Sequence, residues 1–459
     1  MFSLFIRQVI GDSIRLTKRV SLIFILVFTA VAVIDLTAVN FFTYSGVELP
    51  TSANITLFVI FSATFAIAST LLLNSVRKLI SKSNGLPSKL KRFQVIIFAT
   101  QILMVAIILV IVLQMLIMNK YSLLLLQGST YLTHISALLF LIFLVSIFVG
   151  WLKSRRNYII MLYTISFSLI SFNVFISMIY LEYQYTFTNS PLRKPYPVSS
   201  YVTRQEITPW SESLATTFDV LSLSSFFVIW VATVILLSQY RFKLGRAKYF
   251  GLLFIPLIYY LFPFQGYFGN IFSSFVIDSP VAFGIIYVLT FSATKQVGAL
   301  LFGLAFWTAS SLVAKDGVSK SLLISAIGMA MLFGSVDIAT LQYRLYPPFG
   351  LVTEAFMPIG SYLLFIGIFT SATGVARDTN LRKEFYKSAK SQLGLLKTIG
   401  ITQMENELLK EYKPLLDRSK TMEKYEYQQI EQEEVKEIIH DVLIELQSRE
   451  NQLSKDNSK

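Results

Sequence analysis

Apolar segments of membrane-spanning length alternate with short polar segments along the first 375 residues, whereas the residues that follow are heavily charged. A helix needs about 20 apolar residues to cross about 30 Å of hydrocarbon. Six segments meet this requirement clearly, and they lie near residues 21–43, 55–75, 93–118, 131–152, 157–181 and 217–239. The pattern predicts an all-α fold, a polytopic transmembrane helical bundle with a soluble helical tail.

Five further apolar runs follow, near residues 249–263, 271–293, 297–314, 321–341 and 351–375. The stretch from 249 to 293 is interrupted by Pro263 and Pro280 and by two glycines between them, and proline removes a helical hydrogen bond. We therefore expect this stretch to cross the membrane once, with one part re-entrant, interfacial or broken. The prediction is about ten spans, and eleven or twelve remain open.

Basic residues alternate between the connections as the positive-inside rule requires. The connection after the second span is rich in Lys and Arg, from Arg77 to Arg92, whereas the connection after the first span has no cation. Arg377, Arg382 and Lys383 directly follow the last span. Both termini are therefore predicted to be cytoplasmic in a multi-pass protein of the cell (plasma) membrane, which an even number of spans allows.

The chain is predicted to have three parts: a basic N-terminal interfacial segment (1–20), a transmembrane helical domain (21–375) and a cytosolic charged helical tail (376–459). For residues 2–19, a disordered basic leader is an equal alternative to a short interfacial helix.

The tail is predicted to contain several helices. The first covers residues 379–399 and is expected to end with a glycine cap at Gly400, and a capping box at 402–405 is expected to start the second. An apolar stripe on the last one forms a predicted interaction face, made of Val435, Ile438, Ile439, Val442 and Leu446. This face needs a cover, which a cytosolic protein partner, self-association or the first tail helix could supply.

Charge and composition exclude several functions. The net charge is +13, but the tail from residue 377 onward has 15 basic and 16 acidic residues, which leaves 25 basic and 11 acidic residues in the membrane part. The excess lies in loops beside the bilayer, so no nucleic acid partner is expected. The chain has no cysteine and only two histidines, His134 and His440. Thiolate, haem and multi-histidine metal sites are excluded, no cofactor is expected, and no catalytic motif indicates an enzyme.

Ionisable residues inside a bilayer are candidate functional sites because burying a charge is costly. The candidates are Asp35, Asp278, Asp337 and Glu354. Asp278 lies beside a helix break, and the alternative role is a cap for a helix that opens at Pro280. Asp337 and Glu354 flank Arg344 in the sequence, and paired charges at a span end could gate a pathway. Interfacial ion pairs in an aromatic belt are the stronger expectation. His134, near the start of its span, is expected at the membrane interface rather than in a proton relay.

Small residues form a stripe on the last span. Gly360, Gly367 and Gly374 recur every seven residues, and Ser321, Ser325 and Gly328 make a weaker stripe on the preceding span. Small residues on one face let another helix approach closely. We expect packing within the chain, with contact between chains as the alternative.

The tail carries a resemblance to known proteins. The segment 382–387 (Arg-Lys-Glu-Phe-Tyr-Lys), the segment 403–405 (Gln-Met-Glu) and the segment 434–440 (Glu-Val-Lys-Glu-Ile-Ile-His) resemble tails of uncharacterised polytopic membrane proteins of ammonia-oxidising archaea. The resemblance covers about the last 80 residues. It implies a prokaryotic plasma membrane, and it implies no site residue.

Two functions fit these observations. The first is a non-enzymatic sensor or assembly component that displays a cytosolic helical interaction tail and contacts the lipid bilayer. The alternative is a secondary transporter with a midplane site at the broken segment 263–280, although the first half of the chain has no matching break where an inverted repeat would place one.

Overall fold

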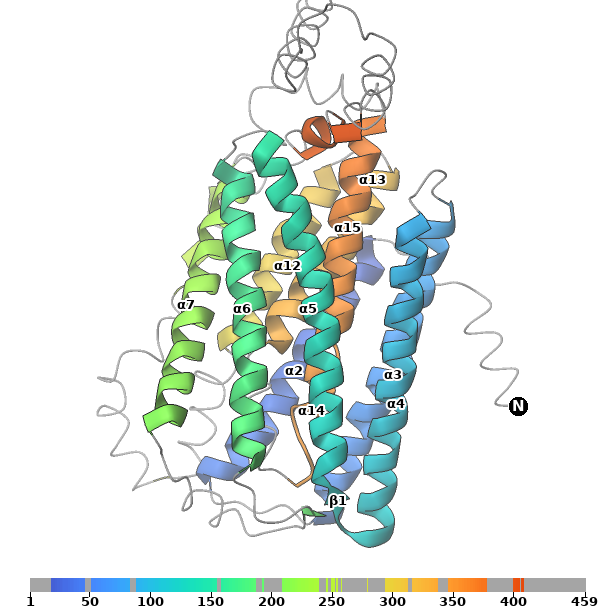
Figure 1. Ribbon diagram of the computed structural model, residues 1–459, viewed down its shortest axis with the longest axis vertical. Coiled ribbons are helices and arrows are strands. Elements are labelled where there is room, and N and C mark those ends of the chain that lie inside the picture. The colour runs from blue at the N-terminus through green and yellow to red at the C-terminus, as the bar shows by residue number, and fades with distance from the viewer. Residues whose placement is uncertain are drawn as a thin grey trace, which may run out of the picture.

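A computed structural model of the chain shows a bundle of long helices (Figure 1). The structure describes residues 18–45, 51–82, 88–154, 158–186, 192–193, 209–238, 294–312, 316–336, 346–377, 399–404 and 406–407, and a few single residues between 245 and 279. The interaction face predicted at 435–446 lies outside these residues, as do Asp278, Asp337 and most of the stretch from 249 to 293.

The described part contains long helices and one short helix. Their bounds are α2 (Lys18–Ser45), α3 (Thr51–Lys82), α4 (Ser88–Met118), α5 (Leu123–Ser154), α6 (Tyr158–Thr186), α7 (Pro209–Ser238), α12 (Thr294–Leu312), α13 (Asp316–Ser335), α14 (Leu351–Glu354) and α15 (Met357–Arg377). Two-residue strands β1 (Tyr121–Ser122) and β2 (Leu192–Arg193) pair antiparallel at the end of the bundle where α5 begins.

Seven helical segments among the described residues are long and apolar enough to cross a membrane. They run 28 residues in α3, 27 in α4 and 32 in α5, all above the length that a bilayer requires. The predicted all-α membrane bundle is therefore confirmed. Nine of the ten predicted spans overlap long helices of the described part, and most of the stretch from 249 to 293 lies outside it.

The helices α13 and α15 form the centre of the bundle. They pack on each other along their length, α12 and α2 pack on α13, and α5 packs on α15. The helices α5, α6 and α7 follow one another along one side, and α3 and α4 form a hairpin on another side (Figure 1). Large apolar side chains of α3 and α4, such as Ile67 and Ile102, are exposed on the outside of the bundle.

The glycine stripe of α15 lies against α13. A methyl carbon at Gly360 would lie 2.7 Å from the backbone nitrogen of Leu332, and one at Gly367 would lie 2.6 Å from the backbone nitrogen of Ser325. Gly374 faces Val318 at 3.0 Å, and Gly328 of α13 faces Leu364 in return. The two backbones approach so closely that only glycine fits, and the contact is within the chain.

The first residue of α2 and the last turn of α15 lie at the same end of the bundle. The indole nitrogen of Trp307 donates to the Lys18 carbonyl at 3.0 Å, which places the start of α2 at the end of α12. The next helix, α13, starts there and meets the end of α15 through Val318 and Gly374. An even number of crossings between Lys18 and Arg377 satisfies this geometry.

Candidate functional site

The last apolar segment is broken where it begins. It was predicted as one span over 351–375, but the structure divides it into the one-turn helix α14 and the long helix α15, with a turn at Ala355 and Phe356 between them. Gly350 precedes α14 with φ of 93°, a left-handed conformation that glycine adopts at little cost. Pro347 and Pro348 stand before it and cannot continue a helix from the N-terminal side.

Asp35 of α2 binds the start of α14. Its Oδ1 accepts the Gly350 backbone N–H at 2.9 Å, and its Oδ2 accepts the Thr353 hydroxyl at 2.6 Å and the Thr353 backbone N–H at 3.3 Å. The side chain is fully buried. The carboxylate satisfies N–H groups that a helix start leaves open, so Asp35 caps α14 from another helix.

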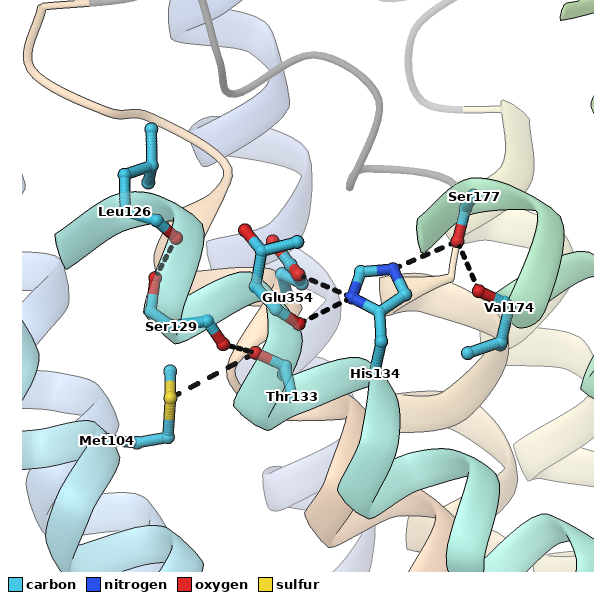
Figure 2. A network of polar contacts seen from close by, with 9 residues as sticks. Met104, Leu126, Ser129, Thr133, His134, Val174, Ser177 and Glu354 are labelled. Carbon is cyan, nitrogen blue, oxygen red and sulfur yellow. Dashed lines mark hydrogen bonds and ion pairs between the residues drawn. The ribbon is translucent and has the colours of Figure 1, made fainter. Parts of the chain in front are cut away.

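Glu354, the last residue of α14, forms an ion pair with His134 of α5 (Figure 2). Glu354 Oε1 lies 3.1 Å from His134 Nδ1, and both side chains have 0% exposure. A buried charge is tolerated only with a partner, and each of these groups supplies the other with one. The pair lies between α14 and α5, inside the bundle.

The imidazole of His134 has contacts on both nitrogens (Figure 2). Nδ1 also lies 2.8 Å from the Thr130 carbonyl oxygen, one turn earlier on α5. Nε2 lies 2.9 Å from the Ser177 hydroxyl oxygen of α6. The Ser177 hydroxyl itself donates to the Val174 carbonyl at 2.8 Å. The ring is therefore fixed by three helices, α5, α6 and α14.

Two other hydroxyls of α5, those of Ser129 and Thr133, donate to carbonyls of their own helix. Ser129 donates to the Leu126 carbonyl at 2.6 Å, and Thr133 donates to the Ser129 carbonyl (Figure 2). Thr133 also lies 4.0 Å from the sulfur of Met104 of α4. These groups are used locally, and no cluster of three or more metal-ligating side chains occurs in the part of the chain that the structure describes.

The connection that leads into α14, at residues 346–350, lies at the end of the bundle where α5 begins. The Tyr346 hydroxyl donates to Asn119 Oδ1 at 3.1 Å, and its ring stacks on Tyr121 with centroids 5.9 Å apart. Burial raises the pKa of Tyr346 to about 12, so the phenol keeps its proton and remains a donor. The approach to α14 is thus bonded to the connection between α4 and α5.

The opposite end of the bundle holds the beginning of the tail. Trp151 of α5 donates to Gln403 Oε1 at 3.1 Å, and the Ser154 hydroxyl donates to Asn406 Oδ1 at 2.9 Å. Gly400 packs directly on Val375 of α15. Both α5 and the α14–α15 segment, which carry His134 and Glu354, therefore contact the described start of the tail.

The start of the tail differs from its sequence prediction. Residues 399–404 are helical, so Gly400 lies within a helix and is not a C-terminal cap, and Thr402 does not start a new helix. The close contact with Val375 explains the glycine, because a side chain there would overlap the valine. The helix predicted for 379–399 lies outside the described residues except for Ile399.

Two of the predicted polar candidates meet at α14, and two others cannot be placed. Asp35 bonds to Gly350 and Thr353, and Glu354 is the last residue of this short helix, whereas Asp278 and Asp337 lie outside the described residues. Glu354 and His134 were predicted to lie at the membrane interface, and in the structure both are fully buried in the bundle and pair with each other. Burial of both groups is tolerated because each neutralises the charge of the other.

Two residues of the site were not predicted. Ser177 sits in an apolar helix that contains several other hydroxyl residues, so no local signal marks it. Thr353 precedes Glu354, and its position beside a buried acid was the available signal. Comparisons with protein-family models, with curated proteins and with solved structures found no match.

Proposed function

We propose that this chain is a non-enzymatic membrane sensor that transmits the state of its buried polar cluster to its C-terminal tail. The observation that supports the proposal is that α5 and the α14–α15 segment each contact both the polar cluster and the tail. The helix α5 holds His134 and also donates to the tail through Trp151. The α14–α15 segment holds Glu354 and also packs on Gly400 through Val375.

The distance between the two sites suits a mechanical link. His134 and Trp151 are 17 residues apart on one continuous helix, which corresponds to about 26 Å at 1.5 Å per residue. A packed helix moves as a unit, so a shift at the cluster reaches the tail as a rotation or translation of α5 against α15. The close glycine contacts hold α15 against α13, so α13 provides a fixed surface along which α15 can move.

The charge distribution favours a cytoplasmic tail. Exposed basic side chains at the helix ends near the tail contact are Lys18, Arg19, Arg77, Arg92, Lys153 and Lys320. The acidic residues Glu182 and Glu212 lie near the ends of α6 and α7 on the opposite side of the bundle. By the positive-inside rule the end with the tail faces the cytoplasm of a plasma membrane, in keeping with the prokaryotic resemblance. The apolar face at 435–446 would then bind a cytosolic protein or a second copy of the tail.

The test measures the position of the tail in lipid nanodiscs. The chain has no cysteine, so spin labels at Lys153→Cys and Lys410→Cys report one distance distribution. We expect a narrow distribution in the parent, a broad one after Trp151→Phe, and a shifted one after Glu354→Gln. Trp307→Phe is the matched control, because it removes an indole donor at the same end of the bundle on α12.

The contradicting result is equally clear. If Glu354→Gln leaves the distribution unchanged while the variant remains folded, the cluster does not act on the tail and the sensor proposal falls.

A second candidate function is secondary transport, and one observation favours it. A helix broken inside the bundle beside a buried acid, as at α14 and Glu354, is how transporters place ion and substrate sites. Proteoliposomes that contain a pH-sensitive dye, tested with a panel of amino acids and organic anions, check this candidate. Solute-driven proton flux that Glu354→Gln abolishes would favour transport.

A further inference from the structure

We propose that His134 and Glu354 form a proton-binding site, and that the proton is the input of the sensor. The site itself stands on the contacts around the two side chains. Only the step from the site to the tail rests on the proposed function.

The hydrogen on Nδ1 is fixed by a carbonyl acceptor. Nδ1 of His134 faces the Thr130 carbonyl oxygen at 2.8 Å and Glu354 Oε1 at 3.1 Å. A carbonyl oxygen can only accept, so Nδ1 carries a hydrogen. The lone pair of the ring must then lie at Nε2, unless that nitrogen also carries a hydrogen.

The contacts of Ser177 place a second hydrogen on Nε2. The Ser177 hydroxyl has one hydrogen and donates it to the Val174 carbonyl at 2.8 Å. Toward His134 Nε2, at 2.9 Å, the hydroxyl oxygen therefore accepts. The ring donates from both nitrogens and is an imidazolium, and the carboxylate of Glu354 balances its charge.

Burial explains why the pair holds one proton. Both side chains have 0% exposure, and a lone charge in such a place is strongly unfavourable. The pair is neutral overall when it holds one ionisable proton beyond the Nδ1 hydrogen. Removing the charge of Glu354 removes the reason for the charge on His134, so the ring should then lose a proton.

Loss of the proton has a defined structural consequence. The proton leaves Nε2 for a water molecule, and the freed lone pair accepts the Ser177 hydroxyl hydrogen, which turns away from the Val174 carbonyl. The Glu354 carboxylate then remains buried without a compensating cation. Because Glu354 ends the four-residue helix α14, movement of α14 that admits water is the available relief. Proton occupancy thus sets the position of α14.

The other titratable groups around the pair are already engaged or distant. Asp35 of α2 is bonded to Gly350, which precedes α14, and to Thr353, the residue directly before Glu354, so its carboxylate is already engaged. Glu182 of α6 accepts from Gln127 and Tyr131 of α5, beyond Ser177 toward the end of the bundle. On α15, Tyr362 lies two turns farther along from Glu354.

On α3 and α13, two further elements packed on α14, the described cations lie at the opposite end of the bundle: Arg77, Lys78 and Lys320. On α4, the group that reaches the neighbouring Thr133 is the sulfur of Met104.

The test counts the protons on the ring of His134. The chain has two histidines, so His440→Gln leaves His134 as the single reporter when a histidine-free affinity tag is used. Nitrogen-15 magnetic resonance of histidine-labelled protein in lipid nanodiscs distinguishes a doubly protonated ring from the two neutral tautomers. At pH 7 we expect both nitrogens to be protonated in the parent and one in Glu354→Gln, with no change in the exposed control Glu212→Gln.

A neutral ring in the parent, or a doubly protonated ring in Glu354→Gln, would overturn the proposal. Ser177→Ala provides a second variant if Glu354→Gln does not fold. It should move the Nε2 resonance and leave Nδ1 in place, and an unmoved Nε2 resonance would also overturn the assignment.

The two proposals fail separately. A neutral ring combined with a tail that still responds to Glu354→Gln would contradict the proton-site proposal and support the sensor proposal. A doubly protonated ring combined with an unresponsive tail would support the proton-site proposal and contradict the sensor proposal.

Discussion

The central and peripheral helices of the bundle differ in how much of their surface is buried and in how apolar they are. The most apolar 18 residues of the α14–α15 segment are all buried, whereas 33% of the corresponding residues in α3 and 39% in α4 are buried. The central segment is the least apolar of these three segments. A helix that faces lipid needs apolar side chains, whereas a helix that faces protein can use glycine and hydroxyl residues and can hold charge. The acid–histidine pair therefore lies in the centre.

The comparison predicts its largest effect at the ion pair. Glu354→Gln should lower the free energy of unfolding by about 3–5 kcal/mol, because it leaves a buried partner without its counter-charge. Reversible unfolding in bicelles measures the change. The matched control is Glu212→Gln on exposed α7 surface, which should stay within about 0.5 kcal/mol of the parent. Equal losses in the two variants would show that the central position has no special role.

The glycine contact should give the next effect. Gly367→Ala places a methyl carbon 2.6 Å from the Ser325 backbone nitrogen, and overpacking of this kind costs about 3 kcal/mol. Gly150→Ala on α5 is the matched control, since open space surrounds that position. The control should be neutral or slightly stabilising, because alanine favours helix over glycine. A tolerated Gly367→Ala would mean that α13 and α15 do not pack as closely as described.

A smaller effect is expected at the cap of α14. Asp35→Asn keeps the shape of the side chain but replaces one acceptor oxygen with an amide that donates, so an N–H or the hydroxyl at α14 loses its partner. The cost should be about 2 kcal/mol. The same unfolding assay checks it. Asp35→Ala should cost no less, and a smaller loss than for Asp35→Asn would contradict the capping role.

The smallest effect is expected on the lipid face. Ile102 of α4 has 69% exposure, and Ile102→Ala should change the unfolding free energy by less than about 0.5 kcal/mol. Met104 lies two residues away with 0% exposure, and Met104→Ala should cost about 2–5 kcal/mol. Equal effects at the two positions would contradict the assigned lipid face of α4.

The sequence predicted the helices well because spanning length is a local property. The predicted segment 93–118 lies within α4, and 157–181 falls almost entirely within α6. It also singled out Asp35 and Glu354, because an acid in an apolar segment is visible without any structure. Their partners were not predictable, since the bonds from Asp35 to Gly350 join residues more than 300 positions apart.

The tertiary contacts of two other residues were not predictable from the local sequence. His134 near the start of a span looks like an interfacial residue when its neighbour on another helix is unknown. Gly400 looked like a cap, because the sequence does not show that Val375 occupies the space beside it. In both positions a tertiary contact overrides the local pattern.

A double-mutant cycle between His134 and Glu354 tests the central claim most directly. Unfolding free energies are measured for the parent, His134→Gln, Glu354→Gln and the double variant in the same bicelles. If the two side chains form one buried unit, the double variant should cost little more than either single variant, with a coupling energy of about 2–3 kcal/mol. Additive losses would show that the two groups are independent and would contradict the account.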